Sequence, residues 1–276
     1  MPEAPEVQTV LSTLEHQIKG AKILDVKVYY PKLIQNLDVT EFVSSLKNQR
    51  FCDFFRIGKY LGFVMNDLDL IVHLRMEGKF YILKELPSDL KHIHCVMYLD
   101  DGRLLCYHDT RKFGRMALYP KAVDVRRLDC FKNVGYDCLD ENLDGMTFYK
   151  IIHPLKRNIK SALLDQSIIA GVGNIYADEI LFSCKLDPRS RCQKISKKDC
   201  ENIIYHTKRI IRGAMKAGGT TIRSYTSSLG VTGLFQLELK VHSKKDEPCP
   251  VCKNKIKKII VSQRGTYLCS NCQKRK

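Results

Sequence analysis

Four cysteines near the C-terminus are spaced as metal ligands. Cys249 and Cys252 form one Cys-x-x-Cys pair, Cys269 and Cys272 form a second, and sixteen residues separate the pairs. Two such knuckles can close four thiolates tetrahedrally around Zn²⁺. Because four sulfurs leave no open coordination position, the spacing predicts one structural zinc ion, which replaces the hydrophobic core that so short a segment cannot build.

The residues between the two cysteine pairs could present a positive charge. Gln263-Arg264-Gly265-Thr266 is typical of a β-hairpin tip from which Arg264 projects. A guanidinium in that place suits bidentate contact with phosphate, and a solvated hairpin arginine is the alternative.

The other eight cysteines show no pairing by spacing. The first residues of the chain lack the basic and apolar regions of a signal peptide, and no apolar stretch reaches the roughly 20 residues that span a bilayer. We therefore expect a cytoplasmic protein without a membrane partner, whose remaining thiols stay reduced and pack in the core. They are Cys52, Cys95, Cys106, Cys130, Cys138, Cys184, Cys192 and Cys200.

The charge of the chain points to an acidic partner. Its 276 residues include 46 Lys and Arg against 30 Asp and Glu, a formal net charge of +16. Residues 238–276 hold eleven basic and three acidic side chains, so half of the net charge lies in this short segment. Such a surplus favours nucleic acid, although ribosomal and membrane-surface proteins share it. The length allows two or three domains and a monomer that folds by itself.

The elements that must position these residues change in type along the chain. Apolar side chains recur at helical spacing over residues 3–19 and stop at Gly20, which predicts an N-terminal helix. From 22 to about 120 the period becomes two, with Asp101-Gly102 as a hairpin turn, which predicts a β-sandwich or barrel. The clearest strand-like runs are 54–65, 69–74, 79–83, 95–99 and 104–107.

Beyond about residue 130 the pattern is helical. Helices are predicted around Ile159–Leu164, over 175–182, and from Ser196 to Gly218-Gly219, where Ser196 and Asp199 resemble a capping box. The buried face of the last helix is predicted to hold Ile203, Ile204, Ile210, Ile211 and Met215. The chain thus has an α+β multidomain pattern: a helix and strands, then helices, then a four-cysteine zinc finger.

Seven segments, in order along the whole chain, resemble the formamidopyrimidine-DNA glycosylase family. The resemblance implies an N-terminal catalytic β-sandwich domain (1–130), a helix-two-turn-helix domain with a base-capping loop (131–237) and a zinc finger (238–276), with damaged duplex DNA in the cleft between the two main domains. It also implies a bifunctional glycosylase and AP lyase that removes oxidised purines. The segments are MPEAPEV at 1–7, RIGKYL at 56–61, HLRMEGKF at 73–80, YHDTRKFG at 107–114, GVGNIYADEILF at 171–182, GGTTIRSY at 218–225 and SQRGTYLCSNCQ at 262–273.

The resemblance assigns the chemistry to the start of the chain. Pro2 becomes the nucleophile once Met1 is removed: its amine forms an imine with the sugar C1′, and β,δ-elimination follows. Glu3 transfers protons at the deoxyribose, and Glu6 in the same turn has a structural role. Without the family, Pro2 would be a helix-starting residue and Glu3 an exposed partner of the helix dipole.

The resemblance also implies contacts with DNA. Lys59, His73, Asn174 and Arg264 bind backbone phosphates, with Lys59 near the damaged nucleotide. The resemblance also counts Lys59 and Arg264 among the catalytic residues. An exposed lysine at a strand end and an ordinary Asn N-cap are the alternatives for Lys59 and Asn174. The gap left by the extruded nucleotide is filled by Met76, Arg111 and Phe113, although composition alone would place Met76 and Phe113 in the core.

Residues 220 to about 235 correspond to the family's loop over the extruded base. Candidates for base recognition are Thr221, Arg223 and Tyr225 in this loop and Glu77 outside it. Two alternatives remain. One is a glycosylase for oxidised pyrimidines that resembles endonuclease VIII, and the other is a zinc-finger protein that binds DNA without catalysis.

Overall fold

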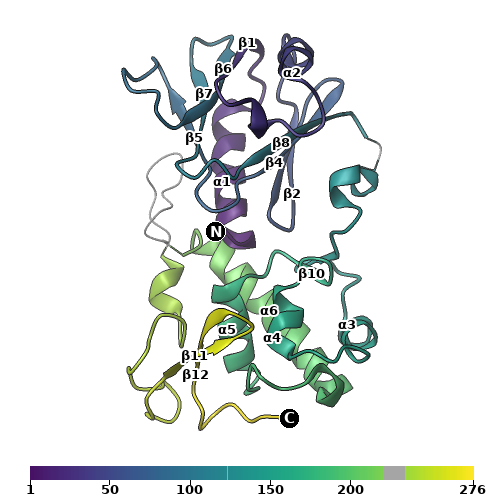
Figure 1. Ribbon diagram of the computed structural model, residues 1–276, viewed down its shortest axis with the longest axis vertical. Coiled ribbons are helices and arrows are strands. Elements are labelled where there is room, and N and C mark those ends of the chain that lie inside the picture. Colours follow the sequence, from purple (N-terminus) through teal and green to yellow (C-terminus); the bar gives the residue numbers. More distant parts are fainter. Residues whose placement is uncertain (123, 221–233) are drawn as a thin grey trace. The chain divides into compact units, whose positions relative to one another are not determined.

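The chain folds into two compact units (Figure 1). The computed structural model describes residues 1–122, 124–220 and 234–276. Of these, the first unit comprises Met1–Lys132 and 218–220, and the second comprises 133–217 and 234–276.

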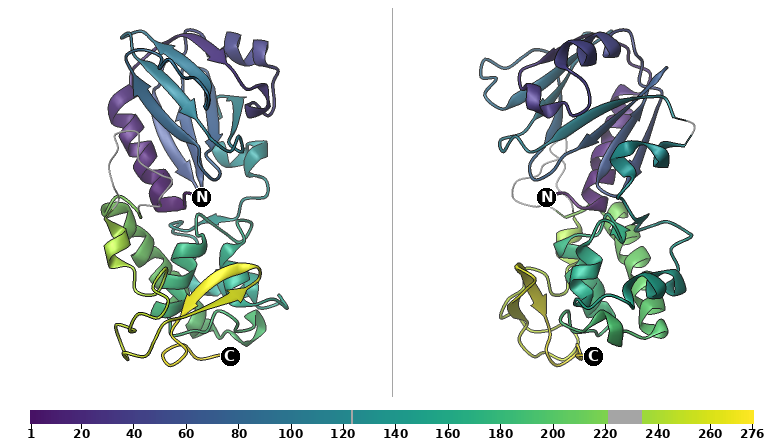
Figure 2. Two further views of the ribbon diagram at one scale, coloured as in Figure 1. Left: turned by 60° about the vertical axis from the view of Figure 1, so that its left-hand side comes forward. Right: turned by 45° about the vertical axis from the view of Figure 1, so that its right-hand side comes forward.

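The first unit is a β-sandwich with a helix against it (Figure 2). All strand pairs in its two sheets are antiparallel. One sheet has the order β1 (Ile23–Val28), β6 (Ile93–Leu99), β7 (Leu104–His108), β5 (Lys79–Leu83). The other has the order β2 (Asp53–Ile57), β3 (Tyr60–Val64), β4 (Leu68–His73), β8 (Arg115–Pro120). Helix α1 (Ala4–Ile18) contributes Leu14 to a core shared with Phe63 of β3 and Tyr107 of β7, which confirms the predicted sandwich.

The predicted helix and strands of this unit are largely confirmed. Gly20 has a φ of +85° directly after α1, and Gly102 has a φ of +83° in the turn between β6 and β7. The predicted run 54–65 is two strands, because Gly58, with a φ of +58°, turns the chain between β2 and β3. Strand β8 was missing from the predicted runs. The remaining elements are α2 (Val39–Leu46), η1 (Pro31–Leu33), η2 (Val125–Arg127) and η3 (Asp129–Phe131).

The second unit is mainly helical and carries the cysteine pairs. Its helices are α3 (Gly145–Ile152), α4 (Ile159–Leu164), α5 (Asn174–Ser183) and α6 (Lys197–Lys216), with the short η4 (Cys192–Lys194) and η5 (Phe235–Glu238). Two strand pairs accompany them: β9 (Tyr136–Asp137) with β10 (Ile169–Ala170), and β11 (Lys257–Val261) with β12 (Arg264–Leu268). The capping box of Ser196 and Asp199 is present at the start of α6.

Two groups of predicted core residues need correction. On α6, Ile203, Ile204 and Ile211 are buried, whereas Ile210 and Met215 at the margins of the apolar face are only half-buried. Of the eight cysteines outside the pairs, Cys52 is exposed because it lies ahead of β2 at the sheet margin, and Cys130 and Cys184 are half-buried. Within the described ranges, no helix combines the length and apolarity needed to cross a membrane.

Candidate functional site

The start of the chain forms a buried cluster of ionisable groups. Pro2 is buried, and Glu3 is only 3% exposed at the N-cap of α1. Burial lowers the pKa of the Met1 α-amine, and the nearby charge of Lys59 lowers it further, against the opposing carboxylates of Glu3, Glu6 and Glu77. The predicted residues Glu3, Lys59 and Glu77 therefore lie around the N-terminus.

Lys59 lies in the tight turn between β2 and β3. The Arg56 Nη1 atom donates to the Gly58 carbonyl oxygen at 2.7 Å, which holds the turn from the strand side. Lys59 is only 4% exposed, so the reading of an exposed strand-end lysine is wrong. The exposed reading of Glu3 fails in the same way. Burying an ammonium and a carboxylate is costly unless they have partners, and this marks the cluster as a site candidate.

Glu6 joins the start of α1 to Thr220, the first residue of the predicted base-capping loop. Its Oε2 accepts the Glu3 backbone N–H at 2.9 Å, and its Oε1 accepts the Thr220 N–H at 2.8 Å and the Thr220 hydroxyl at 3.0 Å. Gly219 has a φ of +77°, and a Cβ there would lie 2.9 Å from Glu6 Oε1. These contacts agree with a structural role for Glu6. Three candidates for base recognition, Thr221, Arg223 and Tyr225, lie outside the described residues.

His73 ends β4 as a buried neutral imidazole. It is 8% exposed, and burial, together with the charges of Arg75 and Lys59, lowers its pKa to about 3. Its Nδ1 accepts the Arg75 N–H at 3.0 Å, so the proton of the neutral ring is on Nε2. His73 can therefore donate one hydrogen bond to a phosphate oxygen.

The three predicted void-filling side chains lie on two loops of the first unit. Met76 follows β4 and is half-buried, while Arg111 and Phe113, between β7 and β8, are exposed. The Phe113 ring is 47% exposed, and the Arg111 guanidinium carbon lies 5.0 Å from its centroid. Placing Phe113 in the core is therefore wrong. An aromatic ring and a guanidinium held in solvent are available to a partner.

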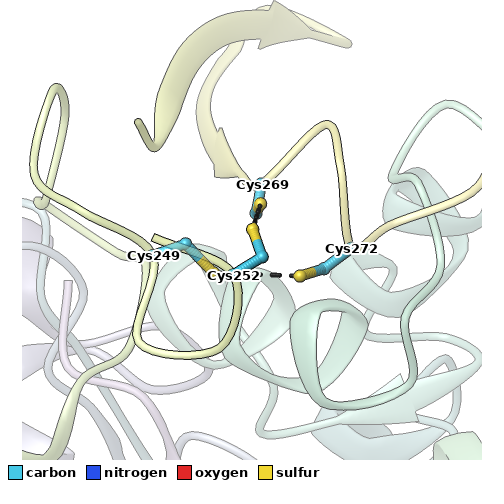
Figure 3. A group of neighbouring side chains, drawn as sticks. All are labelled: Cys249, Cys252, Cys269 and Cys272. Atoms are coloured by element: carbon cyan, nitrogen blue, oxygen red, sulfur yellow. Dashed lines mark hydrogen bonds between the residues drawn. The ribbon is translucent and has the colours of Figure 1, made fainter. Parts of the chain in front are cut away.

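The four predicted zinc ligands come together in the second unit (Figure 3). Their sulfur atoms all lie within 4.8 Å of one another, with Cys252 and Cys269 at 3.4 Å and Cys249 and Cys272 at 3.9 Å. A tetrahedral site with Zn–S bonds of 2.3 Å has S–S edges of about 3.8 Å. The cluster therefore fits one zinc ion. It packs with Phe182 of α5, Val241 and Ile256 in a small apolar core.

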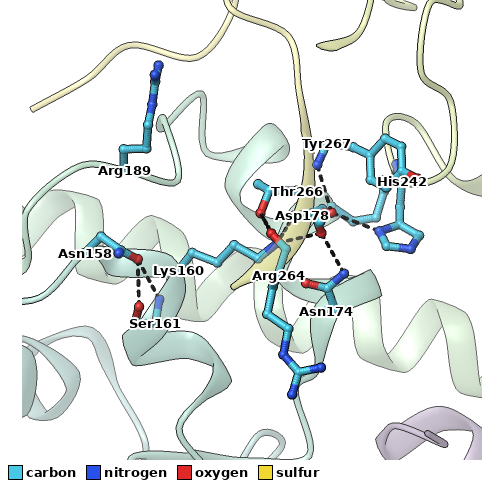
Figure 4. A network of polar contacts seen from close by, with 12 residues as sticks. Asn158, Lys160, Ser161, Asn174, Asp178, Arg189, His242, Arg264, Thr266 and Tyr267 are labelled. Atoms are coloured by element: carbon cyan, nitrogen blue, oxygen red, sulfur yellow. Dashed lines mark hydrogen bonds and ion pairs between the residues drawn. The ribbon is translucent and has the colours of Figure 1, made fainter. Parts of the chain in front are cut away.

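Arg264 and Asn174 are held by a buried polar network that the sequence did not reveal (Figure 4). Lys160 of α4 is fully buried, and its Nζ lies 2.7 Å from both Asp178 Oδ1 and Thr266 Oγ1. Asp178 Oδ2 in turn pairs with His242 Nδ1 at 2.9 Å and accepts the Tyr267 N–H at 3.1 Å. The network therefore fastens strand β12 to helices α4 and α5.

The carboxylate of Glu179, the next residue on α5, binds the backbone at the start of the zinc-finger segment. It accepts the backbone N–H groups of Lys240, Val241 and His242 at 2.8–2.9 Å. These three residues lie 61 to 63 residues after Glu179 in the sequence, so no local pattern could indicate the contacts.

Asn174 and Arg264 lie at the two sides of the α5–β12 contact. Gly173 is the N-cap of α5, so the reading of Asn174 as an N-cap is wrong. Asn174 instead donates through Nδ2 to the Gly265 carbonyl oxygen at 2.9 Å, and its buried Oδ1 has no partner among the described residues. The hairpin turns at Ser262-Gln263, and the exposed Arg264 begins β12.

Three family models match successive parts of the chain. Residues 1–116 match the formamidopyrimidine-DNA glycosylase N-terminal domain, 134–226 match the formamidopyrimidine-DNA glycosylase H2TH domain, and 246–275 match the zinc finger found in FPG and IleRS. The formamidopyrimidine-DNA glycosylase of Ureaplasma parvum is 42% identical over 277 residues, covering 99% of this chain and all of that protein. That of Oceanobacillus iheyensis is 40% identical over 277 residues, covering 100% and 99%.

Solved structures of Lactococcus lactis Fpg have the same fold. Its complex with DNA that contains an abasic site has a TM-score of 0.91 at 35% identity, covering 99% of this chain and all of that one. Its complexes with an N7-benzyl-Fapy-dG DNA and with an oxidised-pyrimidine DNA have TM-scores of 0.91 and 0.90 at the same coverage, with 36% and 35% identity.

Proposed function

The chain belongs to the formamidopyrimidine-DNA glycosylase family, and we propose that it excises oxidised purines through the amine of Pro2. It is a base-excision-repair glycosylase with AP lyase activity that acts as a monomer on damaged duplex DNA. We place it in the cytoplasm and assign residues 1–130, 131–237 and 238–276 to its three functional domains. The observation that carries the proposal is the burial of Glu3 and Lys59 together with Pro2 at the start of the chain.

The proposed chemistry begins when Met1 has been removed, since only then is the Pro2 nitrogen an amine. Burial and a nearby ammonium favour a neutral amine, the form that can attack carbon. A bond forms between the Pro2 nitrogen and the sugar C1′, and the bond from C1′ to the base breaks. The electron pair leaves on the base, which takes up the proton that the Pro2 nitrogen loses. Glu3, in its protonated form, gives its proton to the ring oxygen as the sugar opens to the imine, and the resulting carboxylate then serves as a base in the elimination steps.

The proposed DNA contacts use side chains of both units. Lys59, neutral His73, Asn174 and Arg264 bind phosphates, His73 through its Nε2 proton. Met76, Arg111 and Phe113 fill the space of the extruded nucleotide, with Arg111 on the orphaned cytosine. Glu77, near the N-terminus, is a candidate for base recognition with Thr221, Arg223 and Tyr225.

Zinc has a structural role in this protein. Cys249, Cys252, Cys269 and Cys272 would hold the ion, and Cys269 directly follows β12. When bound, it supplies a rigid crosslink and no open coordination position for chemistry. The hairpin that carries Arg264 is therefore held at one end by metal and at its side by Lys160 and Asp178.

A comparison of lesions tests the proposed substrate. We expect faster single-turnover excision of 8-oxoguanine opposite cytosine than of an oxidised pyrimidine opposite its normal partner. The second candidate, a preference for oxidised pyrimidines, is favoured by the Lactococcus lactis complex with oxidised-pyrimidine DNA. Faster release of the pyrimidine would establish that candidate. DNA binding with no release of either base would leave only a non-catalytic binding protein.

A further inference from the structure

We propose that Asp109 is a positioning residue that holds Arg111 and Phe113 in the loop after β7 and couples this loop to the one that carries Met76. The inference rests on the proposed function, because it takes these three side chains as those that replace the extruded nucleotide.

The Asp109 carboxylate holds the loop by its backbone. The side chain is fully buried; Oδ1 accepts the Arg111 N–H at 2.9 Å, and Oδ2 accepts the N–H groups of Phe113 at 2.9 Å and Gly114 at 2.8 Å. Hydrogen bonds to an ionised acceptor are stronger than neutral ones. Between them, Lys112 has a φ of +58°, a left-handed conformation that a non-glycine residue keeps only with outside support. The directions of Arg111 and Phe113 therefore depend on this carboxylate.

The backbone of Asp109 is itself hydrogen-bonded to His94 of the neighbouring strand β6 and to His92, the residue directly before β6. Its N–H donates to the His92 carbonyl oxygen at 2.9 Å, and its carbonyl oxygen lies 2.7 Å from Nε2 of the buried His94. The start of the loop at Asp109 is thus part of the sandwich, while the side chains of Arg111 and Phe113 at the tip of the loop face solvent. A loop that is anchored at its start and exposed at its tip suits Arg111 and Phe113, because these two side chains must enter a duplex while keeping their relative orientation.

Two contacts couple this loop to the Met76 loop. The Thr110 hydroxyl donates to Glu77 Oε2, next to Met76. The buried Tyr107 hydroxyl lies against both Gly78 and Gly114, where a Cβ at either glycine would collide with it. The two loops therefore pack on one side chain and are tied near their tips, so that a shift of either is transmitted to the other.

The proposal predicts an effect on the reading of the opposite base. Asp109→Asn removes the charge and replaces one acceptor oxygen by a donor that faces backbone N–H groups. We expect single-turnover excision of 8-oxoguanine opposite cytosine to slow by about tenfold, the effect of one charge-assisted hydrogen bond. Excision opposite adenine should slow less, so that the ratio of the two rates falls. Borohydride trapping on a preformed abasic site, which counts folded active protein, should stay close to wild type.

The matched control is Asp101→Asn. Asp101 is an exposed turn residue whose carboxylate also accepts a backbone N–H, that of Arg103 at 3.0 Å, and it should leave the ratio unchanged. A wild-type protein that traps no DNA would contradict the proposed function itself. An Asp109→Asn protein whose two excision rates fall in parallel, or not at all, would overturn the positioning role alone.

A second variant decides the matter if Asp109→Asn does not fold. Thr110 is exposed, so Thr110→Val removes the bond to Glu77 at little risk to the core. Thr110→Val should lower the cytosine-to-adenine ratio, and Thr110→Ser, which keeps the hydroxyl, should restore it. An unchanged ratio in Thr110→Val would refute the coupling of the two loops.

Discussion

Among the single residues, the proposed chemistry uses ionisable groups that the fold has taken out of water. Glu3, Lys59 and His73 are each less than a tenth exposed, although sequence reasoning offered an exposed alternative for the first two. For His73 the consequence is a ring that stays neutral at physiological pH, with its pKa lowered to about 3. A phosphate contact by such a ring is a hydrogen bond from Nε2 and carries no charge.

The buried His73 should make the first unit sensitive to acid. In the unfolded chain His73 takes up a proton as the pH falls through about 6.5, whereas the folded chain resists until about 3. The unfolded state thus binds more protons in this window, and stability falls by up to about 1.4 kcal/mol per pH unit. His73→Gln removes this term. Between pH 7.5 and 5.0, we expect the wild type to lose about 2 kcal/mol more unfolding free energy in urea than the variant.

The control for this measurement is His16→Gln, which changes an exposed histidine in the last turn of α1. Equal losses of stability in the wild type and in His73→Gln would show that the ring is not buried in its neutral form.

At the level of elements, helix α5 holds the C-terminal segment through three polar side chains. Asn174, Asp178 and Glu179 lie on this one helix, and all three bind backbone of the C-terminal segment. The zinc site could be predicted from the sequence because each pair of ligands lies within four consecutive residues. The role of Lys160 could not be predicted, because its partner Thr266 lies 106 residues away and nothing in the sequence distinguishes a buried lysine from an exposed one.

The Lys160–Asp178 pair should behave as a buried ion pair. Lys160→Met leaves a buried carboxylate with fewer partners and should cost roughly 3–5 kcal/mol of unfolding free energy. Lys160→Met combined with Asp178→Asn removes both charges and keeps an acceptor for the Tyr267 N–H, so we expect the double variant to be more stable than Lys160→Met alone. Chemical unfolding of the zinc-loaded proteins measures both values.

The control for the ion pair is Lys244→Met, which breaks a surface pair with Glu247 and should cost no more than about 1 kcal/mol. The single variant Asp178→Asn completes the comparison. If the double variant loses at least the sum of the losses of Lys160→Met and Asp178→Asn, the charges of Lys160 and Asp178 are not paired to each other.

At the scale of the whole molecule, the sequence predicted the order of the parts better than their contacts. The α+β class, the strands of the first half, the helical segments and the finger follow from periodicity, turn residues and cysteine spacing, whereas the choice of a sandwich over a barrel came from the family resemblance. The two strands within 54–65 were missed because the turn at Gly58 interrupts no alternation, and Phe113 looked like core because its exposure depends on a loop held by Asp109. Such contacts between distant or backbone atoms leave no periodic pattern.

If the Pro2 amine is the nucleophile, the covalent adduct formed with the sugar must lie on the Pro2 nitrogen. The protein is reduced with borohydride while it acts on a duplex containing 8-oxoguanine opposite cytosine, digested with trypsin and analysed by mass spectrometry. We predict a chain without Met1 whose adduct lies on the nitrogen of Pro2, in the N-terminal peptide that ends at Lys19. An adduct on a lysine such as Lys59, or on a chain that keeps Met1, would contradict the account.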